Sequence, residues 1–252
     1  MKIFKQPEIF LLLFITVSSL GCRSHYGLTS ANRDKYVIND QLPVDSAIVQ
    51  KYMPYKQQVE AQMSSVIGQS ARELTKPDNQ PETLLANFFS DAVLSEGKKI
   101  DPSIQFTVPS TKGGLRTSLP AGDIRLSNIF ELMPFENEMV VLKVKGSDVE
   151  QLLNFIAQTG GQPVAGIRMK IVSQKPVEVL IDGQPFDKEK TYTILTSDYL
   201  AGGGDNTLGM KNPLEKKVLG LKLRDALINY IKTSTASGKI IDAQLDGRIT
   251  NH

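Results

Sequence analysis

MVVLKVKGSDVEQLLNFIA, residues 139–157, is the stretch that decides the fold of this chain. Its first part, Met139 to Val144, is almost entirely apolar and predicts a buried strand. Ser147 follows at a position suited to cap a helix, which we expect from Asp148 to Ala157. A buried strand joined directly to a helix indicates a sheet that is covered by helices.

Similar patterns continue on both sides of this stretch. Several strands follow one another between residues 167 and 196 without a helix, which favours a mixed sheet over a purely parallel one. We therefore predict an α/β (α+β) fold with a mixed β-sheet flanked by helices. Pro54 should kink or divide the first helix, and Ser127 should cap the third. The expected strands lie at 65–68, 104–108, 167–172, 177–181 and 192–196, the other helices at 45–63, 81–94, 127–133 and 221–233, and an extended segment at 240–249.

The N-terminus has the layout of a secretory signal. Lys2 and Lys5 precede an apolar run from Ile9 to Val17, and small residues lead up to Cys22. The apolar run is about half of the ~20 residues that a membrane-spanning helix needs. We expect residues 1–21 to be a signal peptide that is removed on export.

Cys22 is the only cysteine, and its position after Gly21 resembles the lipobox of bacterial lipoproteins. A lone cysteine cannot form an internal disulfide, so we expect it to carry lipid, although an ordinary thiol is the alternative. Residues 22–44 are polar and should form a tether, and residues 45–250 should form one domain. The sequence thus predicts an exported, membrane-anchored lipoprotein on the periplasmic or cell-surface side.

The composition excludes several kinds of function. The formal net charge is +2 over 252 residues, which gives no electrostatic reason to expect nucleic acid as a partner. The two histidines, His25 and His252, lie near the ends of the chain and leave no basis for a catalytic metal pair or a histidine-based triad. Asp198 and Asp205 are the nearest candidates for an acid–base pair, but their spacing does not fix a catalytic separation.

Two aromatic residues lie in motifs suited to holding a planar ligand. Phe135 follows Pro134, and Tyr199 leads into Gly202-Gly203-Gly204-Asp205. With Arg116 and Asp205 as polar partners, the two rings indicate a slot for a nucleobase. The alternatives are that Phe135 fills the core and that Arg116 forms a surface salt bridge.

Several motifs in the same order resemble the C-terminal domain of 5′-nucleotidases. They are Glu82-Thr83-Leu84-Leu85-Ala86-Asn87, Gly113-Gly114-Leu115-Arg116, Ala121-Gly122-Asp123-Ile124, Pro134-Phe135-Glu136-Asn137, and Tyr192 to Ala201 followed by Gly203-Gly204-Asp205. In that family a separate N-terminal metallophosphoesterase domain holds two metal ions and cleaves the phosphate ester. This chain resembles only the specificity domain.

The resemblance implies roles for five substrate-binding residues. Phe135 and Tyr199 would hold the base between them, Asp205 would bind the ribose hydroxyls, Asn87 would reach the base, and Arg116 would face the phosphate. Asn87 could instead be a polar residue on an exposed helix face. No catalytic residue, metal ligand or cofactor is expected in this chain, and divalent metal ions are expected only on a partner phosphoesterase. Glu136 replaces a glycine of the family pattern and should add negative charge beside the slot.

These features lead to two hypotheses. In the first, the chain is the nucleotide-recognising component of a split 5′-nucleotidase hydrolase, and a separately encoded metallophosphoesterase performs the hydrolysis in nucleotide catabolism. In the second, it is a non-catalytic, nucleoside-binding surface lipoprotein. A scaffold that has lost binding is the remaining option.

Overall fold

The computed structural model describes residues 27–28 and 30–251. The predicted signal peptide and Cys22 lie outside these residues. Contacts divide the chain into two units, one ending at Val49 and one beginning at Gln50, and each is described by itself. In the described part of the first unit, residues 30–45 form neither helix nor strand.

The first helix of the described residues is α2 (Ser46–Met63), which matches the helix expected at 45–63. The Asp45 carboxylate accepts the backbone N–H groups of Ala47 (2.9 Å) and Ile48 (3.2 Å). Pro54 lies inside this helix and does not divide it, and none of its residues is buried. Among the described residues, no helix has the length and the apolar character needed to cross a membrane.

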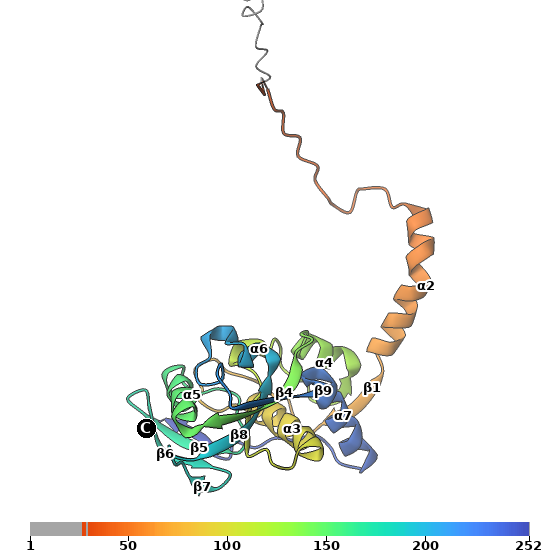
Figure 1. The fold of residues 1–252 in the computed structure, drawn as a ribbon. Helices are drawn as coiled ribbons and strands as arrows, with labels where there is room; N and C mark the ends of the chain where they lie inside the picture. The colour runs from red at the N-terminus through yellow and green to blue at the C-terminus, as the bar shows by residue number, and fades with distance from the viewer. Residues whose placement is uncertain (1–26, 29, 252) are drawn as a thin grey trace, which may run out of the picture. The chain divides into compact units, whose positions relative to one another are not determined.

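The second unit is built around a central sheet of four strands in the order β2-β8-β4-β9. Strand β2 runs parallel to β8, whereas β4 is antiparallel to both of its neighbours, so the sheet is mixed, as predicted. Figure 1 shows β8, β4 and β9 together within this unit. The strands are β2 (Phe106–Val108), β4 (Glu138–Lys145), β8 (Thr191–Ser197) and β9 (Glu215–Lys222).

Alternate residues of β4 supply two hydrophobic cores, because successive side chains of a strand point to opposite faces. Met139 and Val141 pack in one core, mainly with α3 (Leu84–Ile100), α4 (Leu126–Leu132) and α7 (Leu223–Ala236). Val140 and Leu142 pack in the other, with α5 (Gly146–Gln158), β5 (Ile167–Val172) and β6 (Lys175–Ile181). The apolar stretch at 139–144 is therefore the centre of the fold.

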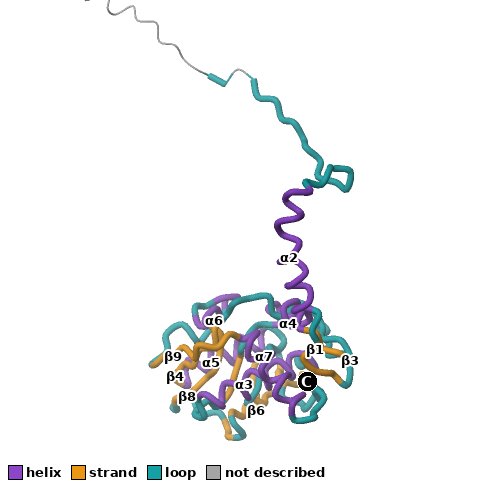
Figure 2. The backbone as a smooth tube through the Cα atoms, turned by 90° about the vertical axis from the view of Figure 1, so that its right-hand side faces the viewer, coloured by secondary structure: helices purple, strands orange, loops and turns teal. Residues whose placement is uncertain are grey.

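Two further sheets complete the unit. The second sheet has the order β10-β5-β6-β7, with β10 parallel to β5, and β1 pairs with β3. Figure 2 shows β1 and β3 side by side, and β1 contacts α7. The strands are β1 (Val66–Ser70), β3 (Gly122–Arg125), β5 (Ile167–Val172), β6 (Lys175–Ile181), β7 (Gln184–Pro185) and β10 (Ile249–Asn251).

Some predicted boundaries are wrong. Ser127 does not cap α4, because Arg125 precedes the helix and the Asn128 side chain accepts the Arg125 N–H (2.8 Å). Ser147 lies inside α5, whose first residue is Gly146. The helix expected at 81–94 continues to Ile100, and the helix expected from 221 starts at Leu223 because β9 extends through Lys222.

Candidate functional site

Three loops meet at one end of the central sheet. Strand β4 begins where β8 ends, since Met139 is paired with Ser197. Strand β2 runs parallel to β8, so the segment that follows β2 leaves the sheet at the same end. They are residues 109–116 after β2, residues 133–137 before β4, and residues 198–206 after β8, a connection that begins with the short helix α6 (Asp198–Ala201).

These loops enclose a pocket of about 310 Å³. The pocket combines two aromatic rings with a guanidinium, a carboxylate and close backbone. It brings together four of the five residues predicted to bind substrate: Arg116, Phe135, Tyr199 and Asp205. The complete lining is Ser110, Gly113, Gly114, Arg116, Phe135, Asn137, Tyr199 and Asp205.

Both rings are exposed on the pocket. Phe135 is 39% exposed and Tyr199 48% exposed, so neither is a core residue. The Tyr199 ring lies over Gly204, where an added Cβ would come within 2.4 Å of ring atoms. Glycine at 204 therefore lets the loop backbone support one side of the ring. Solvent-exposed aromatic rings that line a hollow are suited to stack on a planar ligand.

Asp205 is held in place before any ligand binds. The backbone of Asp205 has a left-handed conformation (φ 52°), which aspartate tolerates better than most residues do. One carboxylate oxygen accepts a hydrogen bond from the Tyr199 hydroxyl (2.8 Å), and the other accepts one from the Thr111 hydroxyl. The bond to Asp205 raises the pKa of Tyr199, so this hydroxyl stays protonated at neutral pH. A carboxylate has about four lone-pair sites, so Asp205 can still accept further hydrogen bonds.

Arg116 presents its guanidinium to the pocket. The residue is exposed, and in the described part of the chain its only side-chain hydrogen bond runs from Nη1 to the Gly113 carbonyl (3.2 Å). The salt bridge that sequence reasoning offered as an alternative is not formed with any described carboxylate. The guanidinium thus has donors left for an anionic ligand.

Asn87 lies elsewhere. It is buried in α3, and its amide donates to the Glu82 carboxylate (2.6 Å) and to the Gln244 carbonyl (2.7 Å). Glu82 also accepts the backbone N–H groups of Asp246 (2.8 Å) and Gly247 (3.0 Å). The two side chains together hold the segment before β10, and Asn87 does not line the pocket.

Sequence reasoning assigned no role to Asn137 and Ser110, which also line the pocket. Asn137 belongs to the Pro-Phe-Glu-Asn motif that contains Phe135, and this shared motif is the signal that could have identified it. Ser110 lies outside the recognised motifs, and only the path of the loop after β2 brings it to the pocket. No local sequence pattern could therefore have identified it.

Glu136 does not leave a free negative charge beside the rings. Its carboxylate is bonded to Lys222 and Arg224, and it does not line the pocket. These two hydrogen bonds, first from Lys222 and then from Arg224, lower the pKa of Glu136 to about 2. The Arg224 guanidinium also lies over the Phe130 ring, 4.2 Å from its centroid. The charge that the sequence places at 136 is therefore offset by two cations.

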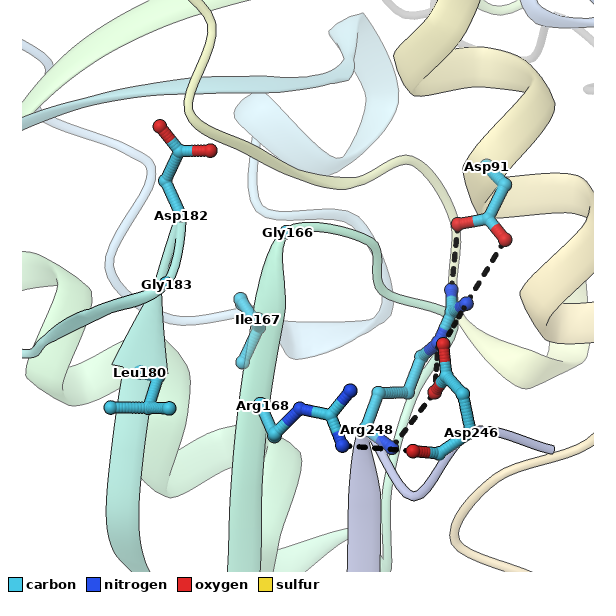
Figure 3. A pocket seen from close by; sticks show the side chains of 9 residues that line it. All are labelled: Asp91, Gly166, Ile167, Arg168, Leu180, Asp182, Gly183, Asp246 and Arg248. Carbon is cyan, nitrogen blue, oxygen red and sulfur yellow. Dashed lines mark hydrogen bonds and ion pairs between the residues drawn. The ribbon is translucent and has the colours of Figure 1, made fainter.

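A second hollow lies next to an ion-pair cluster and is shown in Figure 3. Arg248 donates to both oxygens of Asp91 (2.8 and 2.9 Å), to both oxygens of Asp246 (3.1 and 2.8 Å), and to the Val164 carbonyl (3.0 Å). All five N–H groups of a guanidinium are used by these bonds. This arginine has no donor left for a ligand, so the cluster fits a structural role.

The described residues contain no group of three or more His, Cys, Asp or Glu side chains placed to hold a metal ion. The pocket thus offers stacking surfaces, one anchored carboxylate and one guanidinium. This arrangement can bind a ligand that has a flat ring, hydroxyl groups and negative charge.

Comparison with known proteins places the chain among proteins of matching fold. A family profile described as 5′-nucleotidase, C-terminal domain, matches residues 66–212, which is more than half of the chain. The chain therefore belongs to this family.

Individual relatives are similar over most of this chain. The cell wall protein Lmo0130 of Listeria monocytogenes is 25% identical over 218 residues, covering 77% of this chain and 28% of that protein. The protein UshA of Yersinia enterocolitica is 25% identical over 221 residues, covering 84% of this chain and 36% of that protein. The crystal structure of a 5′-nucleotidase precursor from Thermus thermophilus matches with a TM-score of 0.68 at 25% identity, covering 83% of this chain and 44% of that one.

The structural match confirms the predicted fold class. The chain spans less than half of the length of each of these relatives.

Proposed function

We propose that the pocket between Phe135 and Tyr199 binds the nucleoside part of a nucleotide. The observation that carries this proposal is the pair of exposed rings at the end of the central sheet, with Asp205 and Arg116 beside them. The base stacks between the rings, Asp205 accepts hydrogen bonds from ribose hydroxyls, and Arg116 faces the phosphate. We do not assign Asn87 to the ligand, because its amide is bonded to Glu82 and Gln244.

Such a site binds weakly on its own. Stacking contributes ~1–3 kcal/mol per base, and a hydrogen bond to a charged group contributes ~1.5–3 kcal/mol. Association itself costs several kcal/mol. We therefore expect a dissociation constant in the range of about tens of micromolar to millimolar.

The test is calorimetric titration of the full chain with adenosine and AMP. Phe135→Ala and Tyr199→Ala should each weaken binding by about five- to a hundredfold, which is the stacking contribution expressed as affinity. Tyr55→Ala is the matched control, because Tyr55 is 72% exposed in α2 and lies outside the pocket. A folded wild-type chain that binds neither ligand contradicts the proposal.

We further propose that the chain is the recognition component of a split 5′-nucleotidase. Relatives named 5′-nucleotidase are longer, and this chain matches only part of each. A separately encoded metallophosphoesterase, carrying divalent metal ions, supplies the hydrolysis in this scheme. The full chain should then raise the rate of AMP hydrolysis by that partner, and Arg116→Ala should reduce the gain. If adenosine binds but no phosphoesterase is stimulated, the chain is a non-catalytic nucleoside-binding lipoprotein.

Export and anchoring through Cys22 remain part of this proposal. The basic start, the short apolar run and the small residues before Cys22 support it, and one relative is named a cell wall protein. Cells that express the wild-type chain should incorporate a labelled fatty acid into it, whereas Cys22→Ser should not be labelled. Equal labelling of both chains contradicts the anchor.

A further inference from the structure

One side chain joins the two loops that carry the rings. The Asp198 carboxylate oxygen Oδ1 accepts the backbone N–H of Tyr199 (2.8 Å) and the backbone N–H of Glu138 (3.1 Å). Tyr199 is its neighbour in the chain, and Glu138 lies three residues after Phe135. A single oxygen is therefore bonded to both ring-bearing segments.

This link lies just beyond the end of the strand pairing. The ladder between β4 and β8 ends at Met139 and Ser197, so Asp198 and Glu138 come directly after its last pair. Asp198 is the first residue of the short helix α6 (Asp198–Ala201), and the Leu200 N–H donates to the hydroxyl oxygen of Ser197, which caps this helix (3.2 Å). The carboxylate thus continues the connection where the backbone ladder stops.

The Phe135 loop is held independently on its other side. The Leu223 N–H donates to the Asn137 carbonyl (3.0 Å), and Glu136 is bonded to Lys222 and Arg224. These contacts fix the loop to β9 and α7, whereas Asp198 fixes it to the Tyr199 segment. Asp198 therefore adds a side-chain contact between the two ring-bearing segments, beside the backbone pairing of Met139 with Ser197.

That distance matters because stacking is short-ranged. Carbon atoms in contact lie ~3.5–4.0 Å apart, so two rings that hold a base between them must be about 7 Å apart. A radial gap of ~0.5–1 Å already loses about a quarter to a half of the contact energy. A slot that widens by this amount would therefore bind the base less tightly.

We propose that Asp198 is a positioning residue that sets the width of the slot between Phe135 and Tyr199. The expected effect of Asp198 on ligand affinity rests on the proposed function of the pocket. The positioning of the two rings by Asp198 is a property of the ligand-free protein and can be measured without a ligand. Asp198 does not line the pocket and acts only through the two rings. Its exposed position means that substitution removes hydrogen bonds without opening a cavity in the core.

The first readout needs no ligand. The chain contains no tryptophan, so Phe135→Trp introduces a single indole at the slot, which can be excited at a wavelength that the tyrosines do not absorb. In this background, Asp198→Ala should lower the fluorescence anisotropy of the indole and increase its quenching by acrylamide. Asp198→Asn keeps an oxygen acceptor of the same reach and should leave both values unchanged. The proposal is overturned if Phe135→Trp alone and its combinations with Asp198→Ala and Asp198→Asn are all folded and show the same anisotropy and the same quenching.

The second readout is adenosine affinity of the full chain. Asp198→Ala should weaken binding by about two- to tenfold, which is a quarter to a half of the stacking contribution expressed as affinity, and Asp198→Asn should keep the wild-type affinity. In a double-mutant cycle, Asp198→Ala should have little further effect once Phe135→Ala is present, whereas its effect should add to that of Arg116→Ala. If Asp198 only stabilised the fold, the loss of affinity caused by Asp198→Ala would add to that of Phe135→Ala and also to that of Arg116→Ala.

The two readouts separate the two possible failures. If wild type does not bind adenosine, the proposed function fails, and the indole measurement still decides whether Asp198 positions the loop. If wild type binds but Asp198→Ala changes neither readout, the positioning role fails alone. Should Asp198→Ala not fold, Asp198→Glu replaces it, since the longer side chain displaces the oxygen while it keeps the charge at the start of the helix.

Discussion

Tyr199 offers a ligand two different groups, the face of its ring and its hydroxyl. The hydroxyl is already bonded to Asp205, and Thr111 holds the other oxygen of the same carboxylate. The ring is supported from below by Gly204. The ring face is therefore free for a ligand, whereas the hydroxyl serves mainly to orient Asp205.

We predict that Tyr199→Phe changes adenosine affinity by no more than about threefold, because stacking remains and Thr111 still holds Asp205. Calorimetric titration of Tyr199→Phe and Tyr199→Ala with adenosine separates the contribution of the hydroxyl from that of the ring. A loss in Tyr199→Phe as large as that in Tyr199→Ala would mean that the hydroxyl itself contacts the ligand.

The low pKa of Glu136 predicts a specific dependence of stability on pH. An ordinary glutamate in the unfolded chain titrates near pH 4.5, and in the folded protein the pKa of Glu136 is about 2, owing to Lys222 and Arg224. The folded state therefore binds the proton less readily, and the stabilisation is fully present above about pH 5. It is lost as the pH falls toward 2.

Urea unfolding of wild type and Glu136→Gln at several pH values tests this prediction. The difference in the free energy of unfolding should be constant from about pH 5 to 7 and should shrink steadily between about pH 4.5 and 2. Glu150→Gln is a suitable control, since Glu150 forms a different exposed ion pair, with Lys188. A difference that is independent of pH down to 2 contradicts the assigned pKa.

At the scale of elements, Arg248 joins three parts of the chain that are distant in sequence. Its guanidinium connects Asp91 on α3, the Val164 carbonyl before β5, and Asp246 ahead of β10. The Arg248 side chain is only 10% exposed, whereas its two carboxylate partners are about half exposed. Removing the arginine leaves two aspartates close together without their shared cation.

We predict that Arg248→Met lowers the free energy of unfolding by about 2–4 kcal/mol, somewhat less than for a fully buried pair because the aspartates reach water. Urea unfolding with an unchanged m-value is the measurement. Arg72→Met breaks the exposed pair between Arg72 and Asp242 and should cost less than about 1 kcal/mol. Equal losses in the two variants would show that the cluster is no stronger than a surface pair.

The elements that sequence reasoning missed share a physical cause. Strand β9 has the sequence EKKVLGLK, and its first four residues are exposed at the edge of the central sheet. Lysines on an edge strand discourage pairing with other chains, but they also remove the alternating pattern by which strands are recognised. Strand β3 is short and has one buried residue, Ile124, so its periodicity is equally weak.

The predicted helix caps are wrong for a related reason. Serine at 127 and 147 fits the usual preference, but the strands that precede α4 and α5 run directly into the helices. The helix starts are therefore fixed by the end of each strand and not by a serine side chain. Local preference was outweighed by the connection between neighbouring elements.

At the scale of the whole molecule, the mixed sheet and its helices could be predicted because the 139–144 stretch of β4 is almost entirely apolar, β5 alternates buried and exposed residues, and β8 is rich in β-branched residues. The pocket could be predicted in part. Arg116, Phe135, Tyr199 and Asp205 share motifs that the sequence shows, and the structure brings them together. Asn87 shares such a motif too, but its surroundings depend on Gln244, a partner 157 positions away that no local pattern reveals.

The pairing of distant segments also bears on how the chain folds. Strand β2 pairs with β8 across some 88 positions, and Ser70 meets Ile241 across 171. Chains with many such long-range contacts fold slowly, because large loops must close before the contacts can form. The segment from Ile241 to Asn251, which carries Arg248, completes these closures. Until this segment docks, Asp91 and the open side of β5 lack their partners, so the native domain cannot form before residues 241–251 are in place.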